Sequence, residues 1–161
     1  MRNLILTSMA VLILGSLANA QEAPAFRHGL GHFVLGPTVI TDGSDAKSAW
    51  QAAVGGEYRF ANGLGIGAEI GGLDNLAQVS FNPYFHLNTL DRRGKLVPFV
   101  TAGFTGAGNM EFGENWLNFG GGVDYWIKNR VGARFEVRDM VDTNHSRPNH
   151  FVGFRMGLVW R

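Results

Sequence analysis

The sequence predicts an all-β protein, an eight-stranded antiparallel up-and-down transmembrane β-barrel. Apolar and polar residues alternate with a period of two in eight successive runs of roughly ten residues, the length that a tilted membrane strand needs. Glycine is abundant, at 23 of 161 residues, and phenylalanine occurs 12 times. Each interior glycine costs a helix about 1 kcal/mol relative to alanine, so this composition favours strands around a crowded interior.

The first twenty residues have the features of a secretory signal peptide. Arg2 supplies the positive start, Leu4 to Leu17 form an apolar run, and Ala18-Asn19-Ala20 is a small-x-small cleavage pattern. An uncleaved anchor is the alternative, but the run is short for a membrane helix, which needs about 20 apolar residues. We therefore expect a cleaved signal peptide over residues 1–20 and one barrel domain over residues 21–161.

The charge and cysteine content narrow the class of partner. Arg2 is one of 14 basic residues, so export leaves 13 basic and 13 acidic residues and a neutral mature chain. A neutral chain gives no reason to expect nucleic acid as a partner. The chain has no cysteine, and a barrel closed by backbone hydrogen bonds has little need of disulfides.

Four strands are expected in the first half of the mature chain. The first, about Gly31 to Thr41, is the least regular, because Pro37 interrupts it. The second, Trp50 to Phe60, alternates most clearly and is followed by a tight-turn signal. The third and fourth, Leu64 to Gly72 and Ala77 to Asn88, continue the alternation.

The second half repeats the pattern. Its expected strands are Leu96 to Thr105, Trp116 to Ile127, Val131 to Val141 and Phe151 to Trp160. Short turns are expected after the second, fourth and sixth strands. Longer polar loops are expected at about Asp42 to Ser48, Leu73 to Leu76, Gly106 to Glu114 and Asp142 to Asn149. Such alternation is typical of outer-membrane barrels, whose outer loops are the place for an extracellular partner.

The two faces of the strands decide which side meets lipid. The bulky face carries most aromatic residues: Trp50, Tyr58, Phe60, Phe81, Phe85, Phe119, Tyr125, Phe135, Phe154 and Trp160. The other face is rich in glycine and carries the charges: Glu57, Arg59, Glu69, Asp124, Arg134, Glu136, Arg138 and Arg155. An eight-stranded barrel leaves just enough room for side chains to fill its lumen, so we place the charges inside and the aromatics against lipid.

The charged set has two interpretations. It is either a paired polar plug or a gated ion path, and we favour the plug because a continuous water channel generally needs more strands. A soluble lipocalin-like carrier is the alternative to a membrane barrel. It would place the charges in water and the aromatics around an apolar ligand, but a solvent-facing strand position has no need of so many glycines.

The chain resembles the small outer-membrane β-barrel proteins, the porin-like superfamily that includes the OmpA and OmpX barrels. The resemblance covers essentially the whole mature chain and is carried by the signal peptide and three segments: 98–104 (PFVTAGF), 119–125 (FGGGVDY) and 152–160 (VGFRMGLVW). It implies a bacterial outer-membrane location, contact with outer-membrane lipid, and insertion by the barrel-assembly machinery. One departure is that such barrels commonly end on an aromatic residue, whereas here Trp160 is penultimate and Arg161 is last.

A catalytic alternative was weighed on residues 144–150 (NHSRPNH). The segment superficially resembles the rim of outer-membrane lipid A deacylases, in which His and Ser are one residue apart and share a face. Here His145 and Ser146 are adjacent, so on a strand they point apart, and no acidic residue follows Asp142. Asp139 or Asp142 could substitute only in an unfamiliar geometry. We expect a polar surface loop and no enzyme activity.

No cofactor or metal is expected either. The five histidines, at positions 28, 32, 86, 145 and 150, follow no metal-ligand spacing. Gly63, Gly65 and Gly67 lack the next glycine and the helix of a dinucleotide-binding loop. The sequence therefore predicts an integral outer-membrane protein with a structural or surface-interaction role and no open channel.

Overall fold

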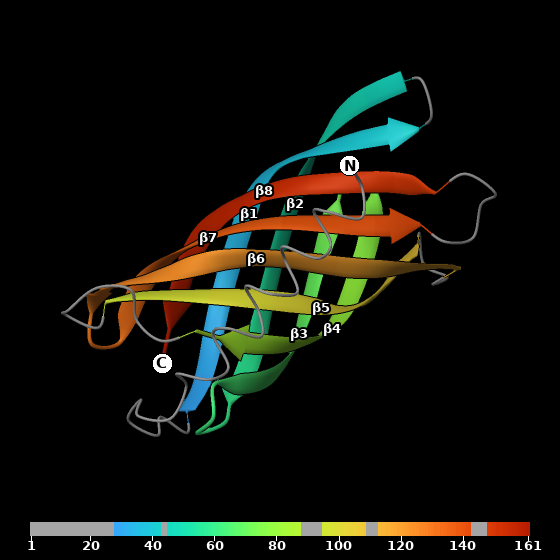
Figure 1. Ribbon diagram of the computed structural model, residues 1–161. Helices are drawn as coiled ribbons and strands as arrows, with labels where there is room; N and C mark the ends of the chain where they lie inside the picture. The colour runs from blue at the N-terminus through green and yellow to red at the C-terminus, as the bar shows by residue number, and fades with distance from the viewer. Residues whose placement is uncertain (1–27, 43–44, 88–94, 109–112, 143–147) are drawn as a thin grey trace, which may run out of the picture.

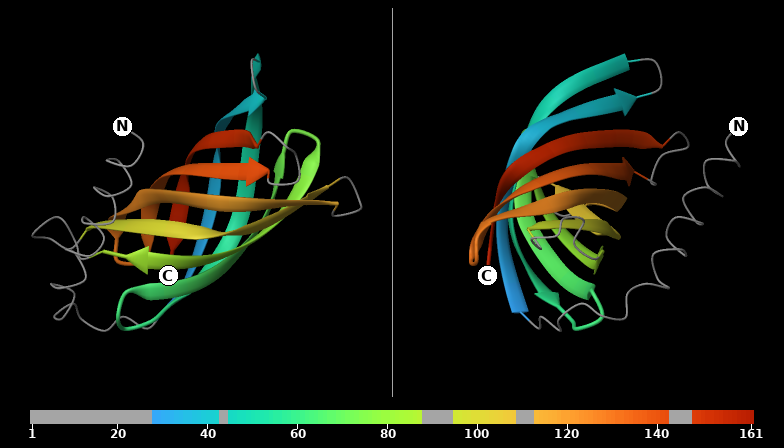
Figure 2. Two further views of the ribbon diagram at one scale, coloured as in Figure 1. Left: turned by 45° about the vertical axis from the view of Figure 1, so that its right-hand side comes forward. Right: turned by 60° about the vertical axis from the view of Figure 1, so that its left-hand side comes forward.

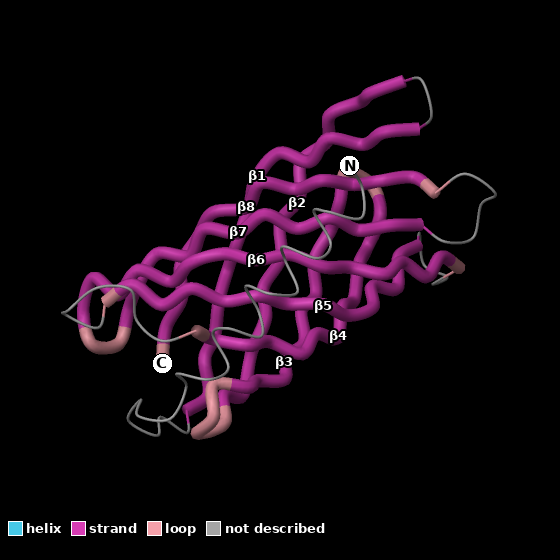
Figure 3. Tube along the Cα trace, viewed as in Figure 1, coloured by secondary structure: helices cyan, strands magenta, loops and turns pink. Residues whose placement is uncertain are grey.

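The computed structural model describes residues 28–42, 45–87, 95–108, 113–142 and 148–161, and its regular structure is entirely β-strand (Figure 3). The expected signal peptide and the residues His145 and Ser146 lie outside this part of the chain. Within the described residues, no helix is long and apolar enough to cross a membrane.

Eight antiparallel strands form a closed barrel in which each strand pairs with its neighbour in sequence and β1 pairs with β8 (Figures 1 and 2). The predicted fold class is therefore confirmed. The strands are β1 (His28–Asp42), β2 (Asp45–Arg59), β3 (Leu64–Leu73), β4 (Leu76–His86), β5 (Leu96–Gly108), β6 (Glu114–Lys128), β7 (Val131–Asp142) and β8 (Asn149–Trp160). We call the end with the β1–β2 connection the upper end, and the end with His28 and Trp160 the lower end.

The strand register gives the barrel a shear of ten residues. A row of paired residues starts at Thr41 in β1, passes through β8, β7, β6 and onward to β2, and returns to β1 at Gly31. Its successive members are Thr41, His150, Val141, Leu117, Phe104, Phe81, Ala68, Gly56 and Gly31. Such a shear requires the strands to tilt against the barrel axis, and the row therefore descends toward the lower end.

The two faces lie as the period of two predicts. Of the ten aromatic residues expected to face outward, nine are exposed and Phe85 is half-buried. The inward face carries buried charged and polar side chains. A soluble carrier would need the opposite arrangement, with its apolar face around a ligand.

Two expectations about the strands were wrong. Pro37 does not interrupt β1, which runs from His28 to Asp42 and pairs Pro37 with Trp50 of β2. Because proline has no N–H, only the other ladder is affected: pairing with β8 stops at Leu35 and resumes at Thr38. β2 begins at Asp45, five residues earlier than expected, because residues 45–49 (DAKSA) continue the ladder with β1 although they have no apolar alternation. This hairpin extends past its neighbours at the upper end (Figure 2).

The expected alternation of short turns and long outer loops is also wrong. At the upper end the strands are joined by two residues (43–44), two (Asp74 and Asn75), five (109–113) and six (143–148). The longest connection, residues 87–95, lies at the lower end, where a short charged turn was expected. Strand pairing therefore extends into segments whose polarity suggested loops.

Barrel closure depends on glycine at the seam between β1 and β8. A Cβ atom at Gly157 would overlap the carbonyl group of Phe33, whereas a Cβ at Gly29 would meet open space. We expect Gly157→Ala to destabilise the barrel by about 1–3 kcal/mol through backbone displacement, and Gly29→Ala to leave it unchanged. Urea titration of the refolded chain, followed on an unboiled gel, measures both. Equal midpoints for the two variants would contradict this account of the seam.

Candidate functional site

The lumen is filled in layers, with an apolar cluster at each end and polar side chains between them. The upper cap consists of Leu73, Ala107, Trp116, Met140 and Phe151, and the lower cap of Leu30, Val97, Trp126 and Val159. In the upper cap the rings of Trp116 and Phe151 stack with centroids 4.5 Å apart. Apart from Asp142, which pairs with Trp116 at the level of the upper cap, the buried acidic and arginine side chains lie between two apolar layers.

Glu69 of β3 is the centre of the upper charged cluster. Arg138 of β7 donates to it through Nη1 and Nη2 at 2.9 and 3.1 Å. Arg155 of β8 donates to the same carboxylate at 3.0 and 3.3 Å. Glu136 binds both arginines, at 2.7 Å from Nε of Arg138 and 2.7 Å from Nη2 of Arg155. Two acidic and two basic groups thus balance across the lumen, all at least 97 % buried.

Two further side chains complete the shell of Glu69. His32 Nε2 lies 2.9 Å from its Oε1, and the hydroxyl of Tyr84 donates to Oε1 at 3.1 Å. Arg138 Nη2 in turn donates to the Tyr84 hydroxyl at 3.3 Å. The carboxylate of Glu69 is therefore contacted from β1, β4, β7 and β8, four strands that surround the lumen.

The lower charged cluster is built around Arg134 of β7. Its guanidinium makes a two-pronged contact with Asp124 of β6, at 2.7 and 3.0 Å, and lies 3.6 Å from Glu57 of β2. His86 Nε2 forms a short hydrogen bond with Glu57. The guanidinium carbon of Arg134 also lies 4.5 Å from the ring centroid of Phe99, a cation–π geometry.

Of the eight charged residues expected in the lumen, seven are buried in these two clusters and the eighth lies at their edge. Arg59 is the last residue of β2 and is half-buried. These seven comprise four acidic groups and three arginines. The imidazoles of His32 and His86 contact Glu69 and Glu57, and the half-buried Arg59 lies near Glu57 and Asp124. An unpaired buried charge costs several kcal/mol, so this balance is a condition for folding.

Glycines on the inward face make room for the long side chains. A Cβ at Gly55 would lie 2.6 Å from His32 Nε2 and 2.7 Å from Glu69 Cγ, and one at Gly65 would lie 2.6 Å from Glu57 Oε1. Each distance is shorter than real Cβ contacts allow. The abundance of glycine on the charged face is therefore a packing requirement of the lumen.

Sequence reasoning overlooked the tyrosine and histidine partners of the network. Tyr84 was not singled out, and His32 and His86 were considered only as metal ligands. The period of two could have identified them, since all three occupy inward positions of regular strands. Within the described residues, no group of three or more His, Asp or Glu side chains could hold a metal ion.

A separate polar pair lies on the outward face near the upper end. His150 Nδ1 is 2.8 Å from Asp139 Oδ2, and the Thr41 hydroxyl donates to the backbone carbonyl of His150 at 3.4 Å. Asp139 was one of the two carboxylates considered for an unfamiliar catalytic geometry, and here it pairs with His150; the other, Asp142, is buried at the upper end of β7. Its expected companions His145 and Ser146 lie outside the described residues.

The comparisons with known proteins find likeness in structure alone. No family model and no curated protein matches the sequence. Neisserial surface protein A matches with a TM-score of 0.67 and 12% identity, over 82% of this chain and 96% of that protein. The N-terminal β-barrel domain of OprF from Pseudomonas aeruginosa matches with a TM-score of 0.56 and 13% identity, over 83% and 98%. A de novo designed transmembrane β-barrel matches at 0.59 and 15%, over 86% and 97%.

Removing the charge of Glu69 tests the network. Glu69→Gln keeps the shape of the side chain but leaves Arg138 and Arg155 with one carboxylate between them. We expect a loss of roughly 3–5 kcal/mol, as for loss of one partner of a buried pair, measured as a lower urea midpoint in lipid vesicles. Asp45→Asn, the same chemical change at an exposed position, is the control and should be neutral. An unchanged urea midpoint for Glu69→Gln would refute the role of Glu69 as the centre of the upper charged cluster.

The likeness to Neisserial surface protein A, the OprF domain and the designed barrel is a likeness of fold. The OprF domain is described as a β-barrel and the designed protein as a transmembrane β-barrel, and this chain is a closed eight-stranded antiparallel barrel with an apolar outer face. The chain has the fold of the small outer-membrane β-barrels.

Proposed function

We propose that this chain is an integral protein of a bacterial outer membrane whose lumen is closed by a plug of paired charges. The observation that carries the proposal is the inversion of polarity: large apolar side chains cover the outside, while eight acidic and arginine side chains are buried inside. Only a bilayer makes such an exterior favourable, since a water-soluble protein rarely exposes so large an apolar surface. The signal-peptide pattern of residues 1–20 supports export to the envelope.

The proposed role is structural or interactive and not catalytic. The connections at the upper end have two to six residues, so a partner would contact strand ends, above all the extended β1–β2 hairpin, more than loops. The outward polar pair of His150 and Asp139 supports a non-catalytic role. The nearby Thr41 hydroxyl donates to the backbone carbonyl of His150 and not to its ring. A lipid-modifying hydrolase needs a nucleophile in hydrogen-bond reach of the imidazole.

Membrane insertion is tested by fractionation of cells that produce the full-length chain. We expect recovery in the outer-membrane fraction, resistance to carbonate extraction, and a faster gel mobility without boiling than after it, because a closed barrel stays compact in detergent. The soluble periplasmic fraction from the same cells is the control. Recovery there would overturn the proposal of a membrane barrel.

Closure of the lumen is tested by conductance. The refolded chain in planar bilayers should give no steady ion conductance, because two charge-paired layers and two apolar caps fill an eight-stranded lumen. The double variant Trp116→Ala and Phe151→Ala removes the stacked pair of the upper cap, and the charged layers beneath it should still block current. Regular single-channel steps from the unmodified chain would contradict the plug and show that the lumen is an ion path.

A further inference from the structure

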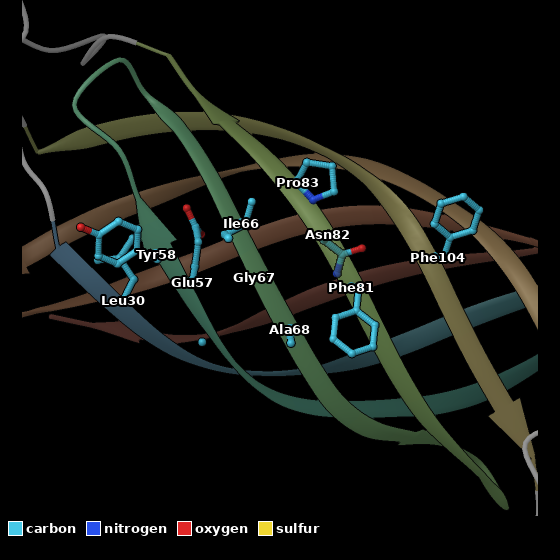
Figure 4. Close-up of a pocket in the computed structure, with 11 residues that line it drawn as sticks. Leu30, Glu57, Tyr58, Ile66, Gly67, Ala68, Phe81, Asn82, Pro83 and Phe104 are labelled. Carbon is cyan, nitrogen blue, oxygen red and sulfur yellow. The ribbon is translucent and has the colours of Figure 1, made fainter.

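The outer wall of the barrel carries an apolar groove that the sequence did not indicate. It crosses β2, β3, β4 and β5, has a volume of about 710 Å³, and is open on one side (Figure 4). Its exposed lining side chains include Tyr58, Ile66, Phe81 and Phe104, all on the outward, apolar face. The groove is thus part of the surface that the proposed membrane insertion places against lipid.

The groove exists because small residues lie between large ones on the outer face. In one row of the register, Gly56 and Ala68 are followed by Phe81 and Phe104. In the next row toward the lower end, Tyr58 pairs with Ile66. Gly56 and Ala68 therefore form a floor between aromatic and branched side chains. Pro83, beside which the β4–β5 pairing skips from Phe81 to Tyr84, also lines the groove.

The direction of the groove matches a lipid chain. The register row descends toward the lower end as it passes from β5 to β2, so the groove runs from Phe104 in the wall to Tyr58, one residue before the end of β2. A tyrosine at this position has an apolar ring for the groove and a hydroxyl for the interfacial region. The groove therefore has one end among hydrocarbon and one end at the membrane surface.

We propose that this groove binds one acyl chain of a phospholipid from the leaflet at the lower end of the barrel. The inference rests on the proposed membrane insertion. Continuity with the apolar belt identifies the occupant, since lipid hydrocarbon is what covers the surrounding wall. A hollow left unfilled would forfeit van der Waals contacts along its lining, and a flexible chain can recover them.

The test uses the mature chain in vesicles of phosphatidylethanolamine and phosphatidylglycerol that contain a little phospholipid with a photoreactive diazirine on one acyl chain. After irradiation, mass spectrometry maps the adducts. We expect adducts at Tyr58, Ile66, Phe81 and Phe104 to exceed those at exposed aromatics of the far wall, Phe119, Phe135 and Phe154, by about threefold, since a seated chain has several extra contacts.

A matched pair of variants links this enrichment to the groove. A Cβ at Gly56 would lie 3.7 Å from the Leu30 carbonyl, an ordinary contact, so Gly56→Leu should fill the groove without disturbing the barrel and reduce labelling to the far-wall level. Gly72→Leu adds the same side chain at an outward position outside the groove, where the nearest atom is 3.5 Å away. This control should keep the enrichment.

The outcomes separate the two proposals. A chain that resists carbonate extraction but is labelled evenly around the barrel overturns the acyl-chain site alone. Cross-links between two copies through β2 to β5 also overturn it, because the groove would then be a dimer interface. A chain that never enters the vesicle membrane overturns both the insertion and the site.

Discussion

The narrow lumen of an eight-stranded barrel is the constraint on which the rest of this structure depends. Such a lumen holds side chains and little else, so each buried charge must find its partner among the other strands. Glu69 meets this condition by accepting from Arg138 and Arg155 together. Those contacts connect β3 to β7 and β8 across the lumen. The network therefore supports closure of the barrel and also neutralises the charge of Glu69.

The positions of the charged and apolar layers along the barrel axis follow from the same constraint. The two charged clusters occupy the middle, where the surrounding wall carries exposed apolar side chains, and apolar caps lie at both ends. At the lower end, the Arg161 guanidinium lies 4.4 Å from the ring centroid of Trp126, and its Nε donates to the Asn129 carbonyl at 2.6 Å. The Arg161 side chain therefore packs over the lower cap, while Trp160 is exposed on the outward face.

The period of two predicted the strands, their faces and the inward position of the charges, because an apolar outer wall on one side and a packed lumen on the other require strict alternation. It failed where neither force acts. Residues 45–49 form the start of β2 without any apolar alternation, since their pairing with β1 and not the bilayer holds them extended. Which charges pair could not be predicted, because the partners of Glu69 depend on the register and the shear, and these are properties of the closed barrel.

The high glycine content has three separate causes that composition alone cannot distinguish. Gly63, with a φ of 85°, completes the β2–β3 turn in a backbone conformation that other residues rarely adopt. Inward glycines such as Gly55 leave volume for His32 and Glu69. Outward Gly56 has no atom close enough to exclude a side chain, so packing within the barrel does not require glycine there. The lack of a side chain at this position instead leaves room for the groove on the outer wall. Whether a glycine serves the turn, the plug or the membrane surface is therefore decided by the face on which the register places it.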